Sequence, residues 1–129
     1  MSSRFPMRVL FVCTANVCRS RMAEEIFREL TLELAGGDGG GHEVRSAGVR
    51  ADPSGRQFVE TDLDWADVVC VMEPAHHTYI VRRFGAASHK VRVLGIPDIY
   101  APGDPVLTDL LATHVRLLLA ERADRGPRA

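Results

Sequence analysis

Two reactive side chains, Cys13 and Arg19, are separated by five residues within the stretch VLFVCTANVCRSRMAEEIF, residues 9–27. A cysteine thiolate is a strong nucleophile, and a guanidinium group offers a planar fork of donors that fits two oxygens of one tetrahedral oxyanion. A thiolate held beneath a bound phosphate group can attack phosphorus. The spacing therefore predicts a short loop in which both side chains serve the same anion.

The residues between them should contribute mainly through their backbone N–H groups: Thr14, Ala15, Asn16, Val17 and Cys18. When a tight loop joins a strand to a helix N-terminus, successive N–H groups point inward, and the helix dipole adds positive potential. Asn16 tolerates the left-handed conformation that tight loops need. Ser20 can donate a hydrogen bond to the sulfur of Cys13 and help it leave later. We expect all of these residues to line a substrate-binding loop.

An ordinary structural explanation competes with the chemical one. A cysteine at a strand end is commonly a small buried hydrophobe, and an arginine at a helix start is commonly solvated. Arg19, however, has the wrong sign for the positive end of a helix dipole. A bound anion would relieve this mismatch, so the chemical interpretation is favoured.

The loop needs a buried strand before it and a helix after it. Four β-rich runs are present: Arg8–Val12, Glu43–Ala47, Val68–Met72 and Lys90–Leu94. The first and third are almost wholly apolar, as in the centre of a parallel sheet, whereas the second and fourth alternate like edge strands. We therefore expect the strand that ends at Cys13 to lie in the centre of the sheet.

Helical patterns separate these strands. Apolar residues recur at helical spacing in three sets: Met22, Ile26, Leu30 and Leu34 with Phe27; His76, Ile80 and Phe84; and Leu107, Leu111, Val115 and Leu118. Asp104 suits the N-cap of the last helix and Pro105 its first position. Residues 53–65 are ambiguous and contain at most a short helix. Residues 36–42 should form a flexible turn, and residues 121–129 a frayed tail.

This alternation predicts an α/β fold, a small doubly wound four-stranded parallel sheet flanked by helices. We expect a single domain over residues 1–129, with an ordered core of about 7–122. Sites in such sheets form at the carboxyl ends of the strands, where Cys13 lies.

The overall composition excludes several classes of function. Sixteen basic and seventeen acidic residues give a net charge of −1, so no nucleic-acid partner is expected. No apolar run approaches the ~20 residues of a membrane span, and the N-terminus lacks a signal-peptide cleavage site, so no membrane association is expected. Three cysteines, an odd number, favour a reducing cytoplasm over a disulfide scaffold.

Residues 9–27 resemble the N-terminal signature of the low-molecular-weight protein tyrosine phosphatases, and the chain is most similar to the short bacterial members. The resemblance continues in EVRSAGV, WADVVCVMEPAHH and GIPDIYAPGDP, and spans roughly residues 7–120. It implies a four-stranded parallel sheet, with Cys13 as the nucleophile that forms a cysteinyl-phosphate and Arg19 as the phosphate ligand. It also implies that Ser20 tunes the thiolate, and that Asn16 and Ser46 join a hydrogen-bond network around the loop.

The chain departs from the family pattern at four places. Ala15 replaces a glycine, and Arg21 replaces a proline. The short segment SGRQF stands where many members have His-x-Ala-Arg, so no histidine is expected to support the loop from there. Asp98-Ile99-Tyr100 replaces the Asp-Pro-aromatic motif of the general acid. These changes are compatible with an anion-binding loop, but they weaken the prediction that the enzyme turns over substrate efficiently.

Two aspartates compete for the role of general acid, Asp98 and Asp104. Both follow the fourth predicted strand. A helix N-cap already explains Asp104, whereas Asp98 has no such structural role and precedes an aromatic residue by two positions. We therefore predict Asp98 as the acid and Tyr100 as a wall of the substrate pocket.

The roles of the remaining cysteines and histidines are less clearly indicated by the sequence. Cys18 is either a packed thiol or, as the family suggests, the partner of Cys13 in a reversible disulfide. Cys70 should be inert core, and Trp65 is also assigned to the core. His76 and His77 are adjacent on a helix and point in different directions, which disfavours a shared metal. No metal or other cofactor is expected, since no ligand set converges on the loop.

The resulting prediction is a cysteine-dependent phosphomonoesterase. Its expected partner is a phosphorylated protein or a small aryl phosphate, with inorganic phosphate or a similar oxyanion as inhibitor. Val17 stands where the family's tyrosine phosphatases tend to have an aliphatic residue, whereas relatives acting on phosphoarginine tend to have threonine. The alternatives are a non-catalytic or weakly active phosphate-binding regulatory module and, less favoured, a thiol-coupled arsenate reductase. The latter needs further relay cysteines, and only Cys70 remains outside the loop.

Overall fold

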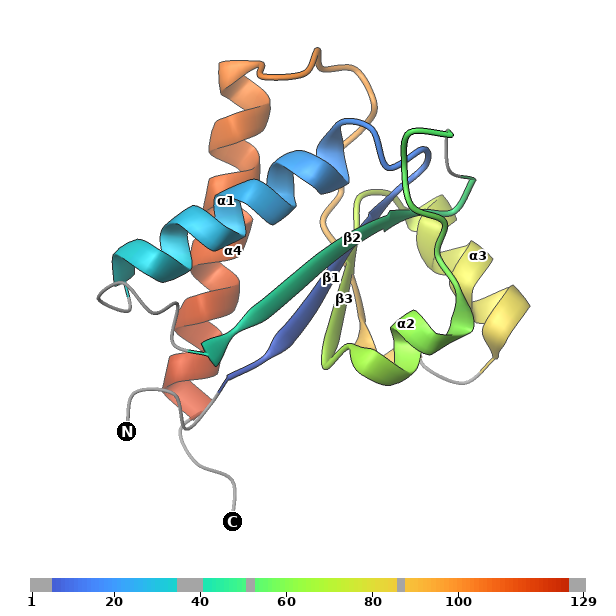
Figure 1. The fold of residues 1–129 in the computed structure, drawn as a ribbon, viewed down its shortest axis with the longest axis horizontal. Helices are drawn as coiled ribbons and strands as arrows, with labels where there is room; N and C mark the ends of the chain where they lie inside the picture. Colours follow the sequence, from blue (N-terminus) through green and yellow to red (C-terminus); the bar gives the residue numbers. More distant parts are fainter. Residues whose placement is uncertain (1–5, 35–40, 51–52, 86–87, 126–129) are drawn as a thin grey trace.

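A four-stranded, wholly parallel sheet forms the centre of the computed structural model, which describes residues 6–34, 41–50, 53–85 and 88–125 (Figure 1). The strands are β1 (Arg8–Cys13), β2 (Glu43–Gly48), β3 (Val68–Val71) and β4 (Val91–Val93), arranged in the order β2-β1-β3-β4. The helices are α1 (Arg19–Leu34), α2 (Glu60–Trp65), α3 (Pro74–Phe84) and α4 (Pro105–Arg125), with a short 3₁₀ turn at Ser88–Lys90. The predicted fold class is confirmed, as are the two central and two edge strands.

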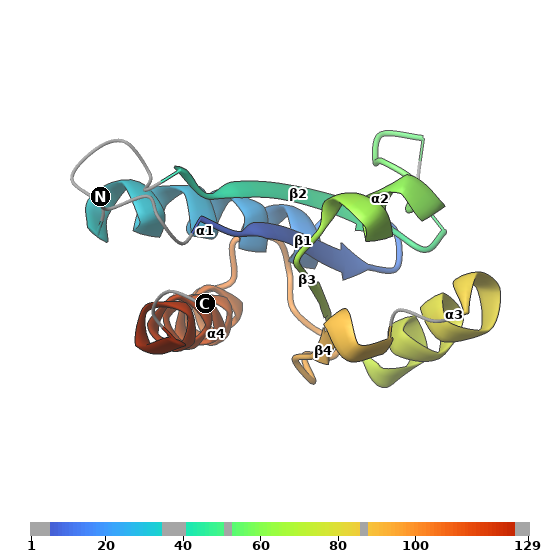
Figure 2. The same ribbon diagram turned by 90° about the horizontal axis from the view of Figure 1, so that it is seen from below.

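Two helices cover each face of the sheet (Figure 2). Side chains alternate along β1, so Val9 and Phe11 pack beneath α1 and α4 while Leu10 and Val12 pack on the side of α2 and α3. All four are at most 1% exposed. Burial on both faces explains why this strand is apolar throughout.

The buried face of α1 is centred differently from the prediction. Ala23, Phe27 and Leu30 are buried, whereas Met22 and Ile26 are only partly buried. A strict four-residue spacing drifts around a helix of 3.6 residues per turn, so Phe27 lies nearer the centre of the stripe. The side chain of Leu34 is outside the described residues. The predicted face of α4 is confirmed, since Leu107, Leu111, Val115 and Leu118 are all buried.

Several boundaries also differ. The tail prediction is wrong for residues 121–125, because α4 continues to Arg125; residues 126–129 lie outside the described residues. Within the predicted turn, residues 36–40 are likewise not described, whereas His42 accepts a hydrogen bond from the backbone N–H of Met7 at 2.9 Å. The ambiguous segment contains α2, and α4 begins as predicted: the Asp104 carboxylate accepts the N–H of Val106 at 2.8 Å.

The topology brings four connections to one edge of the sheet. Cys13 pairs with Gly48 on β2, and Val12 pairs with Val71 on β3, so the three strands end at similar heights. The chain turns to one side after β1 and to the other after β3, and ligands bind at such switch points in open α/β sheets. Among the described residues, no helix is long and apolar enough to cross a membrane.

Candidate active site

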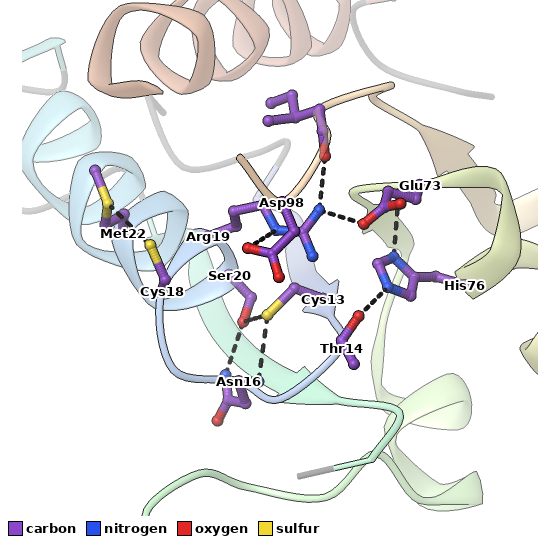
Figure 3. Close-up of polar contacts among 11 residues, drawn as sticks. Cys13, Thr14, Asn16, Cys18, Arg19, Ser20, Met22, Glu73, His76 and Asp98 are labelled. Atoms are coloured by element: carbon purple, nitrogen blue, oxygen red, sulfur yellow. Dashed lines mark hydrogen bonds and ion pairs between the residues drawn. The ribbon is translucent and has the colours of Figure 1, made fainter. Parts of the chain in front are cut away.

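The sulfur of Cys13 lies at the base of the loop that joins β1 to α1 (Figure 3). Its side chain is buried, with 3% of the residue exposed. The sulfur is 3.0 Å from the hydroxyl oxygen of Ser20 and accepts the backbone N–H of Asn16 at 3.2 Å. Both the N–H and the hydroxyl can donate to a thiolate, so these surroundings are suited to stabilising one.

Asn16 fixes the shape of the loop, as its residue type suggested. It is the one non-glycine residue with positive φ among the described residues, at 58°, and it is buried. Its side-chain amide donates to the Ser20 hydroxyl at 2.8 Å, while its carbonyl oxygen accepts the backbone N–H of Arg56 at 2.7 Å. The first bond joins the loop to α1, and the second anchors it to the connection after β2.

Arg56 continues this support into α2, and neither its role nor that of Asp62 was predicted. The guanidinium group of Arg56 donates to the buried carboxylate of Asp62 at 2.8 Å and to the backbone carbonyl of Ser46 at 3.2 Å. Ser46 joins the network as predicted, because Arg56 links its backbone carbonyl to Asn16. The hydroxyl of Ser46 donates instead to Glu24 at 2.5 Å.

Two glycines lie against the backbone of the loop. A Cβ on Gly48 would be 2.7 Å from the carbonyl oxygen of Thr14, and one on Gly55 would be 2.5 Å from that of Ala15. These separations are too short for any side chain. Only glycine allows the connection after β2 to approach so closely.

Arg19 is buried at the start of α1, with 2% of the residue exposed. Its Nη1 atom donates to a Glu73 carboxylate oxygen at 2.6 Å and to the Ile96 carbonyl at 2.7 Å. Its Nε atom lies 3.8 Å from a carboxylate oxygen of Asp98. Glu73, which the sequence did not single out, thus holds one edge of the guanidinium group, and the other donors remain for an anion.

A histidine supports the loop after all, from α3 instead of the segment after β2. His76 Nδ1 accepts the backbone N–H of Glu73 at 3.0 Å, so the proton of the neutral ring is on Nε2 and is donated to Thr14 Oγ1, also 3.0 Å away. Burial lowers the pKa of His76, and the positive charge of Arg19 lowers it further, while Glu73 and Asp98 act in the opposite direction. Both ring nitrogens have protein partners, which leaves neither for a metal shared with His77.

The two candidate acids occupy different environments. The Asp98 side chain is 68% exposed and lies beside Arg19, whereas the Asp104 carboxylate caps α4. Tyr100 is partly buried and packs against the core beneath α1 and α4, and Ile99 is 74% exposed. The structure therefore places Asp98 beside Arg19 and gives Asp104 a capping role.

The three thiols have different surroundings, and all are free. Cys18 is half-buried with its sulfur 3.9 Å from that of Met22, and burial followed by the charge of Asp98 raises its pKa. Cys70 is 1% exposed, and burial raises its pKa to about 12, as expected for an inert core thiol. The disulfide between Cys13 and Cys18 stays a prediction.

The assembled geometry matches the chemistry of phosphoryl transfer. A cysteine sulfur and a buried guanidinium group from the connection after β1 meet an exposed carboxylate from the connection after β4, all at one edge of the sheet. The loop supplies N–H groups and a helix N-terminus for an oxyanion, and Asp98 is open to a leaving group. Among the described residues, no group of three or more histidine, cysteine, aspartate or glutamate side chains is placed to hold a metal ion.

Comparisons with known proteins agree with this geometry. Residues 8–58 match the family model "Low molecular weight phosphotyrosine protein phosphatase". The protein-arginine-phosphatase of Bacillus subtilis (strain 168) is 33% identical over 109 residues, covering 68% of this chain and 70% of the relative. The low molecular weight protein-tyrosine-phosphatase PtpB of Staphylococcus aureus is 33% identical over 96 residues, covering 64% and 68%.

Solved structures show the same similarity. The YwlE arginine phosphatase from Geobacillus stearothermophilus superposes with a TM-score of 0.70 at 28% identity, covering 96% of this chain and 100% of that one. The tyrosine phosphatase Wzb from Escherichia coli K30, in complex with phosphate, gives a TM-score of 0.70 at 26% identity, covering 88% and 96%. The chain therefore belongs to the low molecular weight protein tyrosine phosphatase family of cysteine-dependent phosphatases.

Proposed function

We propose that this chain is a protein tyrosine phosphatase with Cys13 as nucleophile, Arg19 as phosphate ligand and Asp98 as general acid. The observation that carries the proposal is that two groups able to donate to a thiolate, the Asn16 N–H and the Ser20 hydroxyl, lie within hydrogen-bond distance of the Cys13 sulfur. A merely packed thiol does not need them. The loop backbone from Thr14 to Ser20 and the ring of Tyr100 complete the proposed substrate site.

In the first step, the Cys13 thiolate attacks the phosphorus of a phosphomonoester. The sulfur–phosphorus bond forms as the bond from phosphorus to the leaving oxygen breaks. Asp98, in its protonated form, gives its proton to that oxygen. Nε and Nη2 of Arg19 and the loop N–H groups hold the transferring oxygens, while Glu73 keeps Nη1 turned away.

In the second step, water attacks the phosphorus of the cysteinyl-phosphate. Asp98, now a carboxylate, accepts a proton from the water, and the Cys13 sulfur leaves as a thiolate. The hydroxyl of Ser20 and the N–H of Asn16 already point at this sulfur, so they stabilise the leaving group without rearrangement. Inorganic phosphate is the product and should also inhibit by occupying the loop.

Phosphotyrosine on a protein is the proposed substrate, and phosphoarginine is the second candidate. Val17 is 44% exposed at the loop, where an aliphatic side chain can pack against an aromatic ring. The relatives include proteins named for each substrate, an arginine phosphatase and a tyrosine phosphatase. Comparing kcat/KM on a phosphotyrosine peptide and a phosphoarginine peptide, for the wild type and Val17→Thr, decides between them.

The cytoplasm is the proposed compartment, because free thiols near one another persist under reducing conditions. No nucleic-acid partner is proposed, given the net charge of −1.

The decisive experiment is hydrolysis of p-nitrophenyl phosphate by the wild type, Cys13→Ser and Arg19→Ala. Cys13→Ser should lose turnover but keep phosphate binding, since the N–H groups and Arg19 remain; Arg19→Ala should lose both. Cys18→Ser serves as the control for changing a loop thiol. Phosphate binding without turnover in the wild type would instead indicate a regulatory module, and thioredoxin-coupled arsenate reduction would indicate a reductase.

A further inference from the structure

A second pocket, of about 440 Å³, lies between α1 and the edge strand β2, which run beside each other (Figure 1). Its walls carry four arginines from three parts of the chain, together with two buried polar residues: Arg21, Arg28, Arg45, Arg56, Asn16 and Ser46. The proposed catalytic residues Cys13, Arg19 and Asp98 do not line it. Such a concentration of arginines is unexpected in a chain whose net charge is −1.

The charges around this pocket do not balance. Two carboxylates face the four guanidinium groups in the described part of the chain, those of Glu24 and Asp62. Glu24 pairs with Arg28 at 2.7 Å, and Asp62 pairs with Arg56 at 2.8 Å. An excess of about two positive charges remains, and it favours an anionic ligand.

The two remaining arginines are held by contacts that leave their charge uncompensated. Arg45 stacks on the ring of Trp65 at 4.1 Å and is 3.9 Å from Asp62, which Arg56 already occupies at closer range. Arg21 donates one N–H to the backbone carbonyl of Ser54 at 2.9 Å. Both contacts orient a planar guanidinium group, and neither neutralises it. An arginine held in this way is suited to gripping phosphate or carboxylate oxygens.

Close ion pairs explain Arg28 and Arg56, whereas Arg45 shares the single carboxylate of Asp62 with Arg56, and Arg21 has no carboxylate partner among the described residues. The size of the pocket also matches that of small-molecule sites, which enclose about 300–1,000 Å³. We propose that this pocket binds a small polyanion that carries at least two phosphate or carboxylate groups. Its ligand would touch Asn16, the residue that shapes the catalytic loop and donates to the sulfur of Cys13.

Pyrophosphate is the probe for this proposal, with binding followed by the backbone amide signals of the ¹⁵N-labelled protein. In the wild type, two groups of amides should shift during the titration: residues 14–19 in the catalytic loop, and residues 24, 28, 45 and 46 around the second pocket. The double variant Arg28→Gln/Arg45→Gln should keep the loop shifts, while the pocket shifts should need about tenfold or more higher pyrophosphate concentration.

A matched control is Arg82→Gln/Arg83→Gln, which removes two exposed arginines of α3 and should leave both groups of shifts unchanged. Wild-type shifts confined to the loop would overturn the proposal, as would pocket shifts that survive in Arg28→Gln/Arg45→Gln. Failure of the proposed catalytic function has a different signature, namely absent loop shifts and no turnover of p-nitrophenyl phosphate. Dispersed amide signals in each variant report directly that it is folded.

Discussion

Glu73 orients Arg19: the buried guanidinium group of Arg19 donates a 2.6 Å hydrogen bond to the carboxylate of Glu73. The two residues are 54 positions apart: Arg19 begins α1, and Glu73 is the N-cap of α3. Because Nη1 also donates to the Ile96 carbonyl, both N–H groups of Nη1 are engaged by the protein. Arg19 is therefore oriented before an oxyanion arrives.

Replacing Glu73 with Ala should impair phosphate binding. The guanidinium group would lose its charge-assisted hydrogen bond and turn away from the loop, so kcat/KM should fall about tenfold to a hundredfold. Steady-state kinetics on p-nitrophenyl phosphate and the inhibition constant of phosphate measure this effect. Glu73→Gln keeps an acceptor and should lose less. An unchanged phosphate inhibition constant in Glu73→Ala would contradict the orienting role.

Replacing Asp98 with Asn should remove the proposed proton donor. The expected loss in kcat is about 10²-fold for a poor leaving group such as phenol and much smaller for an activated one such as p-nitrophenol. Asp104→Asn is the matched control, since asparagine caps helices nearly as well as aspartate and the rate should barely change. A leaving-group-dependent loss at Asp104 instead would reverse the assignment.

Replacing Gly55 with Ala should displace the catalytic loop. The new Cβ would be 2.5 Å from the Ala15 carbonyl oxygen, so one backbone segment must move. Small displacements of catalytic groups cost up to about a hundredfold in rate, and kcat/KM should fall by a comparable factor. Gly103→Ala is the contrasting control: its φ is +80° but nothing lies within 4 Å of the new Cβ. It should cost ~1 kcal/mol of stability through backbone strain and leave the rate intact.

The lowered pKa of His76 should appear in the pH dependence of stability. Below pH 6.5, His76 binds a proton in the unfolded chain but not yet in the folded chain. The free energy of unfolding should therefore decline from pH 6.5 down to the folded-state pKa of His76. His76→Gln keeps a donor for Thr14 and an acceptor for Glu73 but cannot titrate. Its Tm should therefore fall less steeply than that of the wild type over this window. Parallel Tm profiles would show that His76 does not contribute.

The parts of the site that lie within one strand–loop–helix unit were predictable. Cys13, Arg19, Asn16 and Ser20 fall within eight consecutive residues, where spacing and the helix dipole constrain geometry directly. Asp98 was predicted because Asp104 already had a capping role, and the structure confirms that cap. The regular spacing of apolar residues likewise predicted all four strands and the buried faces of α3 and α4.

The residues that support the loop were not predictable in the same way. Glu73, His76 and Arg56 contact the loop across 54, 62 and 40 positions, and each looks like an ordinary surface or helix-start residue in isolation. The close approach of Gly55 also depends on tertiary contact, since its own φ is unremarkable. The one available signal was the capping pattern Glu73-Pro74-Ala75-His76, which marked a helix start at the carboxyl edge of β3.

The hydrogen-bond path from Asp62 through Arg56 and Asn16 to Cys13 connects the proposed nucleophile to a six-residue helix. A helix this short has little stability of its own, so α2 is a natural candidate for opening before the rest of the chain unfolds. Catalysis should then be the first property to disappear in denaturant. In a urea titration, activity should fall at a lower concentration than helical circular dichroism. Coincident transitions would show that α2 and the core of the domain form one cooperative unit.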